Sequence, residues 1–173
     1  LTDYCELLLG LPDPSLPKLT HALPRMPAIE EQRIWTGSGG HELLQDTISF
    51  TRIVNEWSWK LKKQPLNGAR ILDYGCGFGR ILRAMLYYSD PNKLFGVDPW
   101  DRSIEICQQH GVLATLAQSE FLPKTLPVEG AFDVAYSYSV FTHTSRRATL
   151  AALGALRKSI SDDGFLAITI RDV

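Results

Sequence analysis

The feature that most constrains this chain is a turn with three glycines at alternate positions. Residues 73–79 read DYGCGFG and begin at the last residue of the short, largely apolar segment 70–73. Glycine adopts backbone conformations that other residues avoid, and it leaves room for a ligand to approach. After the turn, Ile81, Leu82 and Met85 recur at helical spacing. We therefore expect a buried strand, a tight glycine turn and a helix, in that order.

The same alternation continues along the chain. Apolar segments that end in turns predict strands, and segments with apolar residues at three- and four-residue steps predict helices. Strands alternating with helices predict an α/β fold with a doubly wound, mostly parallel sheet. The predicted strands are 70–73, 93–98, 112–117, 132–137 and 165–170, and the predicted helices cover 41–63, about 80–86, 102–110 and 145–161.

The first forty residues have a different texture, and we expect them to form an N-terminal arm (1–40) before the main domain (41–173). Dense prolines favour extended chain with short helical turns. Ile34 and Trp35 are apolar side chains on this arm and require burial. Two interpretations remain open, a linker or a wall over a binding cleft. The arm's prolines are Pro12, Pro14, Pro17, Pro24 and Pro27.

Charge and cysteine content limit the classes of partner. The formal net charge is −1, and nucleic-acid-binding proteins usually present a clearly basic face. The basic runs 60–63 and 146–147 are interpreted as solvated helix faces, so no nucleic-acid partner is expected. Cys5, Cys76 and Cys107 are too far apart in sequence for a redox dithiol or zinc motif. We expect no metal, no membrane span and a reducing, cytoplasmic location.

The spacing of the glycines tests whether the turn binds a dinucleotide cofactor. The dinucleotide-binding fingerprint requires glycines at its first, third and sixth positions. Counted from Gly75 the sixth position is Arg80, and counted from Gly77 it is Leu82. Asp73 also precedes the turn, where a carboxylate suits a positively charged ligand better than a pyrophosphate. The pattern therefore argues against a dinucleotide.

Residues 71–80, which read ILDYGCGFGR, resemble the first motif of class I S-adenosylmethionine-dependent methyltransferases. The resemblance covers roughly residues 66–171. Segments similar to later motifs of the family follow at 96–98, 132–143 and 162–166, in the order in which the family has them. It implies S-adenosylmethionine as the cofactor and S-adenosylhomocysteine as the product. It also implies that Asp98 holds the ribose hydroxyls and that Pro99 and Trp100 lie against the adenine.

The resemblance assigns a set of cofactor-binding residues. Many relatives carry an acid after the third strand, whereas this chain has Gln118, whose amide oxygen can still accept a hydrogen bond. Glu120 is interpreted either as an adenine-side contact or as a solvated side chain. The expected cofactor-binding residues are Asp73, Gly75, Cys76, Gly77, Gly79, Asp98, Pro99, Trp100, Gln118, Ser119, Glu120 and Ser137.

A second departure lies at the other end of the chain. Relatives usually add antiparallel strands after the fifth strand, and this chain ends at Val173. We expect a fold without those strands, possible truncation of the domain, and an exposed edge strand. Such an edge is a pairing surface, so a homo-oligomer or a missing C-terminal segment is expected to cover it.

The expected reaction is in-line transfer of a methyl group to an oxygen or nitrogen of a small or medium acceptor. A positioned base is needed only when the acceptor is protonated. His143 is the candidate base, although capping a helix or filling the cleft wall is an alternative role. Tyr138 and Phe141 are expected either to line the acceptor pocket or to pack. The alternative functions are a non-catalytic cofactor-binding or scaffold domain and a different transferase on this fold.

Overall fold

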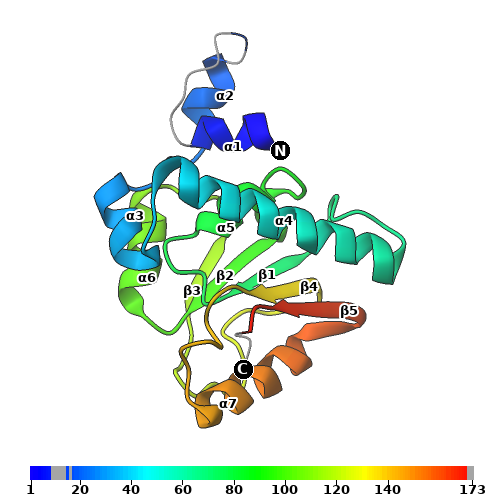
Figure 1. The fold of residues 1–173 in the computed structure, drawn as a ribbon. Coiled ribbons are helices and arrows are strands. Elements are labelled where there is room, and N and C mark those ends of the chain that lie inside the picture. Colours follow the sequence, from blue (N-terminus) through cyan, green and yellow to red (C-terminus); the bar gives the residue numbers. More distant parts are fainter. Residues whose placement is uncertain (9–14, 16, 171–173) are drawn as a thin grey trace.

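Five parallel strands form one sheet in the order β3-β2-β1-β4-β5 (Figure 1). The computed structural model describes residues 1–8, 15 and 17–170. The sheet confirms the expected doubly wound parallel fold, whose strand order reverses between β1 and β4. The strands are β1 (Ile71–Tyr74), β2 (Leu94–Asp98), β3 (Thr115–Gln118), β4 (Phe132–Ser137) and β5 (Ile160–Ile168).

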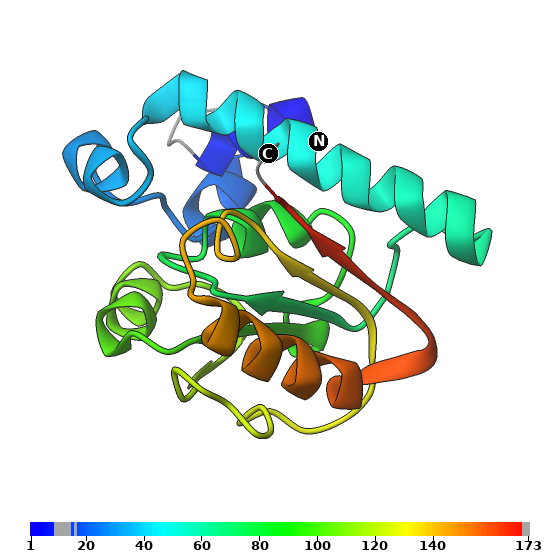
Figure 2. The ribbon, with the colours of Figure 1, turned by 60° about the horizontal axis from the view of Figure 1, so that its bottom comes forward.

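Helices cover both faces of the sheet, as Figures 1 and 2 show. Alternate residues of a strand point to opposite faces, so Ile71 and Leu72 enter different cores. Ile71 packs in the core formed with α4, α5 and α6, and Leu72 packs in the core formed with α7. The helices are α4 (Gly40–Lys62), α5 (Arg80–Met85), α6 (Asp101–Gln109) and α7 (Arg146–Ser159), with a short 3-10 helix η1 (Pro91–Lys93) before β2.

The N-terminal arm contains α1 (Thr2–Leu8), α2 (Pro17–Ala22) and α3 (Ile29–Thr36). Cys5 and Leu8 of α1 pack against α4 and α5. The α3–α4 connection is fixed by Gln32, whose amide donates to the Pro27 carbonyl at 2.7 Å and accepts from the Gly40 amide at 3.0 Å. The prolines at positions 12 and 14 lie outside the described residues. Within the described residues, three short helices therefore take the place of a mainly extended arm.

The start of β5 differs from the predicted boundary. We expected the turn at 162–164 to end a helix, but α7 ends at Ser159 and β5 begins at Ile160. The pairing of β4 with β5 is irregular here, shifting between Phe132 and Val134. Ser161 donates to the Phe132 carbonyl at 3.0 Å, and a Cβ on Gly164 would lie 2.7 Å from that oxygen. The close approach of two backbones explains the glycine and the early strand.

Among the described residues, no helix combines the length and the apolar content that crossing a membrane requires.

Candidate functional site

A cavity of about 780 Å³ lies at the carboxyl ends of β1, β2 and β4. This is the edge of a doubly wound sheet at which ligands bind, next to the reversal of strand order. The glycine turn forms its floor, Trp100 lies at one end, and Tyr138 and His143 lie on the loop after β4. Residues of α3 and of the N-terminal half of α4 complete the walls.

The glycines of the turn have different roles although they share left-handed backbone angles. Gly77 has a φ of 52°, and of the described residues a Cβ there would meet only the Trp35 ring edge, at 4.0 Å. It faces the cavity and leaves its space to a ligand. Gly79 has a φ of 74°, and its Cβ would lie 2.9–3.1 Å from the side chains of Val112, Cys107 and Arg83. Gly79 is therefore required for packing rather than for ligand approach.

Asp98 braces the turn and faces the cavity. Its Oδ2 accepts from the Gly77 amide and its Oδ1 from the Trp100 amide, both at 2.9 Å. Burial raises the pKa of the Asp98 carboxyl, and the hydrogen bonds from the Trp100 and Gly77 amides oppose that rise. A carboxylate oxygen accepts more than one hydrogen bond. Both oxygens thus keep capacity for a pair of hydroxyl donors in the cavity.

Asp73 lies deeper, at the end of β1. It is 2% exposed, and the Tyr136 hydroxyl donates to its Oδ2 at 3.1 Å. Burial raises the pKa of the Asp73 carboxyl to about 8, although the hydrogen bond from Tyr136 opposes the rise. A cation in the cavity would favour the ionised carboxylate. Asp73 is therefore suited to a ligand that carries a positive charge.

The raised pKa of Asp73 predicts a pH-dependent stability. Between the ordinary carboxyl pKa of 3.8 and the folded value of about 8, the unfolded chain releases this proton and the folded chain retains it. The free energy of unfolding therefore falls as pH rises through this window, by up to about 1.4 kcal/mol per pH unit. Asp73→Asn does not titrate, so its stability relative to the original chain should increase from pH 5 to pH 8. Urea unfolding of both proteins measures the difference, and parallel stability curves would contradict the prediction.

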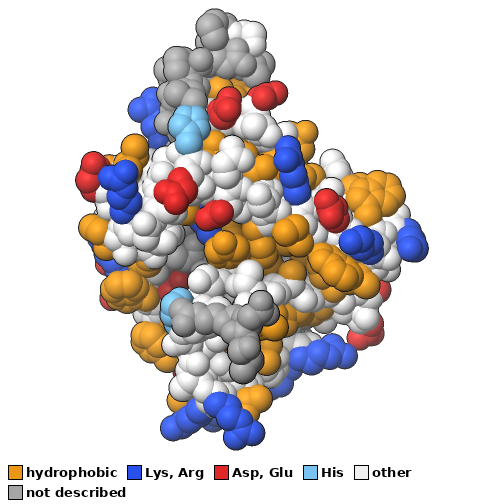
Figure 3. Space-filling view, viewed as in Figure 1, with side chains coloured by type: hydrophobic (Ala, Val, Ile, Leu, Met, Phe, Trp, Pro, Cys, Tyr) orange, Lys and Arg blue, Asp and Glu red, His pale blue; other side chains and the backbone are white. Residues whose placement is uncertain are grey.

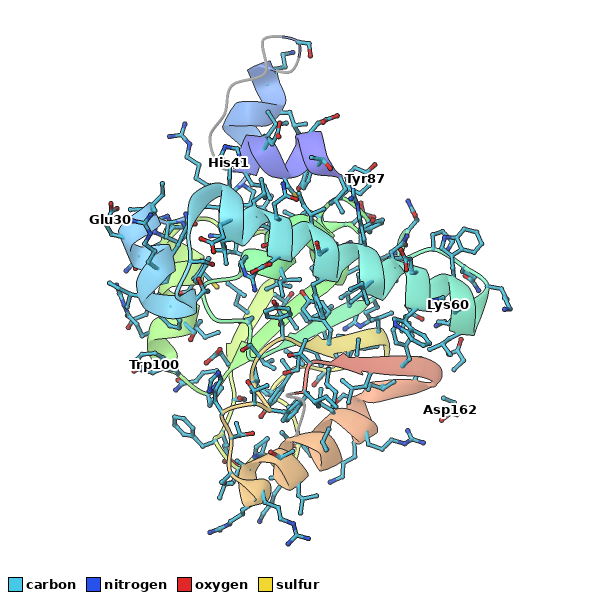
Figure 4. All side chains as sticks on the ribbon, viewed as in Figure 1. Glu30, His41, Lys60, Tyr87, Trp100 and Asp162 are labelled. Carbon is cyan, nitrogen blue, oxygen red and sulfur yellow. The ribbon has the colours of Figure 1, made fainter. Side chains whose placement is uncertain are left out.

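An aromatic wall closes the Trp100 end of the cavity. The Trp35 ring of α3 lies 4.9 Å from the Trp100 ring and 6.3 Å from the Phe78 ring. Glu31, also on α3, forms an ion pair with Arg102 of α6 at 3.7 Å, and its second carboxylate oxygen lies 3.7 Å from Nε2 of His110. Of the two interpretations of the arm, the structure therefore favours a wall over the binding cleft, formed by α3, rather than a linker. Trp100, which is 54% exposed, forms the outer edge of the site (Figure 4).

Two charged residues that line the cavity were not predicted as site residues from the sequence. Arg80 is the first residue of α5, and its guanidinium donates to Thr47 Oγ1 at 2.9 Å. Asp46 lines the cavity from α4. Arg80 directly follows the glycine turn, which was a usable signal for a site residue. Asp46 gave no such signal, because a polar residue on an amphipathic helix is ordinarily solvated.

The structure brings together only part of the expected set. Gln118 and Glu120 are exposed, and the Gln118 amide donates to the Pro99 carbonyl at 3.2 Å. Ser119 and Ser137 are buried, and their hydroxyls have no hydrogen-bond partner among the described residues. The expected residues that line the cavity are Asp73, Gly75, Cys76, Gly77, Asp98, Trp100 and His143, while Gly79, Pro99, Gln118, Ser119, Glu120 and Ser137 do not.

The loop after β4 separates the candidate acceptor-side residues. His143 is exposed and lines the cavity. It does not cap α7, because the N-cap is Ser145, whose hydroxyl accepts from the Ala148 amide at 3.3 Å. Tyr138 lines the cavity, whereas Phe141 stacks on Tyr74 with ring centres 6.1 Å apart. Phe141 thus packs against the sheet, whereas Tyr138 and His143 line the cavity.

Comparisons with known proteins agree with this geometry. A family model described as "Methyltransferase domain" matches residues 71–164, more than half of the chain. A solved TehB-like SAM-dependent methyltransferase from Corynebacterium glutamicum is 25% identical with a TM-score of 0.53, and the match covers 67% of this chain and 61% of that one. Magnesium protoporphyrin IX methyltransferase from Synechocystis, solved with bound SAM, shows the same fold at 18% identity and a TM-score of 0.50, covering 76% and 65% of the two chains.

A curated relative corrects the expected acceptor. The tRNA U34 carboxymethyltransferase of Pseudomonas fluorescens (strain Pf-5) is 32% identical over 123 residues, which cover 66% of this chain and 37% of the relative. A Photorhabdus laumondii protein of the same name is also 32% identical. The expectation of a small-molecule acceptor and no nucleic-acid partner was wrong, since these relatives are named for a tRNA. Net charge averages over the whole surface and does not exclude a local contact with RNA.

The chain spans just over a third of the length of these curated relatives. The matched family model, the parallel sheet and the glycine turn nevertheless agree with one another. The chain belongs to the methyltransferase domain family, and its fold is that of the class I S-adenosylmethionine-dependent methyltransferases.

Proposed function

We propose that this chain binds S-adenosylmethionine in the cavity above the glycine turn and transfers its methyl group to a tRNA acceptor. The observation that supports this most strongly is the junction of Gly77 and Asp98, an open backbone position joined to a buried carboxylate by a 2.9 Å hydrogen bond. This junction suits a ribose, whose adjacent hydroxyls need a shared acceptor and a floor without side chains.

The other lining residues fit the remaining parts of the cofactor. Trp100 offers an aromatic face for the adenine, and the Trp35 wall limits access of water from that side. Asp73 is buried at the centre of the floor, where it can stabilise positive charge. When bound, S-adenosylmethionine supplies an activated methyl group on a positively charged sulfur. The protein's contribution is then mainly alignment and exclusion of water.

The acceptor would approach from the loop after β4. Tyr138, Ser139 and His143 line the cavity there, and His143 is placed to take a proton if the acceptor carries one at working pH. A tRNA acceptor is supported by the curated relatives named for that substrate. Lys and Arg side chains that could contact RNA phosphates lie along α7 and near the end of α4 (Figures 3 and 4).

Ligand-dependent stabilisation tests the cofactor. A ligand that binds only the folded state raises the apparent stability, so S-adenosylmethionine and S-adenosylhomocysteine should raise the melting temperature, and NAD should not. Labelled methyl transfer to unmodified tRNA, with and without the protein, tests the acceptor. Stabilisation by NAD alone would overturn the cofactor, and binding without transfer to tRNA would favour the non-catalytic alternative.

We also propose a cytoplasmic location. Cys5, Cys76 and Cys107 are all free and buried, which fits a reducing compartment.

A further inference from the structure

Arg80 carries a buried positive charge that forms no ion pair with any acidic group among the described residues. The side chain is 8% exposed and lines the cavity. None of the ion pairs formed by the described residues involves Arg80. Its Nη1 donates to two neutral oxygens of α4, Thr47 Oγ1 at 2.9 Å and the Leu43 carbonyl at 3.4 Å. Its guanidinium carbon lies 4.8 Å from the centre of the Tyr138 ring.

Such a charge is costly unless an anion compensates it. Burial lowers the pKa of the Arg80 guanidinium, and Tyr138, Asp46 and Asp73 only partly oppose that effect. The guanidinium has five N–H donors in a planar fork; its bonds to α4 both come from Nη1, and Tyr138 is a further side-chain hydrogen-bond partner. The remaining donors are available to a group inside the cavity. Carboxylates match the fork geometry.

The order of the strands fixes which part of the donor reaches Arg80. Asp98 ends β2, and Tyr138 follows β4, with β1 between these two strands. Neighbouring strands are about 4.8 Å apart, so the β2 and β4 ends lie about 10 Å apart. A donor whose ribose is held at Asp98 therefore extends its amino-acid end across Asp73 toward Tyr138 and Arg80. That end carries an ammonium and a carboxylate.

We infer that Arg80 binds the α-carboxylate of the donor's amino-acid end, while the ammonium faces Asp73 and Asp46. This inference rests on the proposed binding of S-adenosylmethionine. Arg80 is then a positioning residue, since it holds the end of the donor opposite the adenosine and so fixes where the methyl group lies. The competing role is a purely structural strut that joins α5 to α4 through Thr47 and Leu43.

Calorimetric titration with ligands that differ in one group separates these roles. S-adenosylmethionine carries the α-carboxylate, and decarboxylated S-adenosylmethionine lacks it but keeps the amine. The original chain should bind the first about 10- to 100-fold more tightly, the range expected for a hydrogen-bonded charged group. In Arg80→Met this ratio should fall to within about twofold of one. 5′-Methylthioadenosine lacks the whole amino-acid end and should bind both proteins alike.

Two further variants control for the fold. Thr47→Val removes the Thr47 bond to Arg80 and should lower thermal stability while leaving the ligand ratio large. Arg80→Lys keeps the charge without the planar fork and should reduce the ratio by a smaller factor, which keeps the test usable if Arg80→Met unfolds. Melting curves of each variant check folding independently of binding.

The outcomes are distinct. An unchanged ratio in the Arg80 variants, or an equal loss of affinity for all three ligands, overturns the carboxylate assignment and favours the strut. If the original chain binds none of the three ligands, the proposed function itself fails. A collapsed ratio in Arg80→Met, with a preserved ratio in Thr47→Val, establishes the inference.

Discussion

Replacing Gly77 with leucine is expected to abolish detectable binding of S-adenosylhomocysteine. A Cβ at this position points into open cavity space, where the Trp35 ring edge is the one group of the described part of the chain within 4 Å. A leucine side chain would fill the volume that the ribose needs, beside Asp98. The substitution also strains the backbone, because Gly77 has a φ of 52°, and L-residues pay about 1–2 kcal/mol in this region.

A matched control separates the blocked cavity from the backbone strain. Gly111 has a φ of 62°, and a Cβ there would meet nothing within 4 Å, but the residue follows α6 outside the cavity. Gly111→Leu should therefore lose comparable stability and keep its affinity. Calorimetry gives the affinities, and thermal unfolding gives the strain. A folded Gly77→Leu protein that binds normally would show that the ligand lies elsewhere.

Replacing Asp98 with alanine should weaken S-adenosylhomocysteine binding by about 1.5–3 kcal/mol, or roughly 10- to 150-fold in Kd. The loss has two sources. The ribose hydroxyls lose their acceptor, and the amides of Gly77 and Trp100 lose the carboxylate that aligns them at 2.9 Å. The substitution therefore loosens both the glycine turn at Gly77 and the backbone at Trp100.

Asp101→Ala is the control for this experiment. Asp101 begins α6 only three residues later, is exposed, and does not line the cavity. Its removal takes away one carboxylate from the same region and should change the affinity by less than about twofold, as is usual for surface substitutions. An affinity for Asp98→Ala equal to that of the original chain would refute the ribose assignment.

The strands and the glycine turn were predictable because their signals are local. Apolar runs ending at Asp73 and Asp98 identify buried parallel strands, and the glycine spacing identifies the cofactor type. The boundary at Ser159 was missed because an unusual backbone approach, between Phe132 and Gly164, overrides the ordinary preference of Asp and Gly for turns.

The walls of the site were harder to predict because they come from distant segments. Trp35 reaches the glycine turn through a contact that depends on the docking of α3. Arg80 and Asp46 line the same cavity because α5 packs against α4, which no sequence spacing reveals. The residues after β3 were misleading for a related reason. Gln118 lies in the expected place along the chain, yet its amide binds the Pro99 carbonyl outside the cavity.

The docking of α3 couples the arm to the cavity. Trp35 packs against Phe78 of the turn that would hold the donor, and Glu31 and Gln32 attach the same helix to α6 and to the start of α4. Any ligand that packs against Trp35 must therefore also favour the docked arm. A second ligand that favours the undocked arm must weaken the first, and the first must weaken the second by the same coupling free energy. Changes in the N-terminal arm, which lies outside the matched residues 71–164, can therefore alter how tightly the cavity binds its ligand.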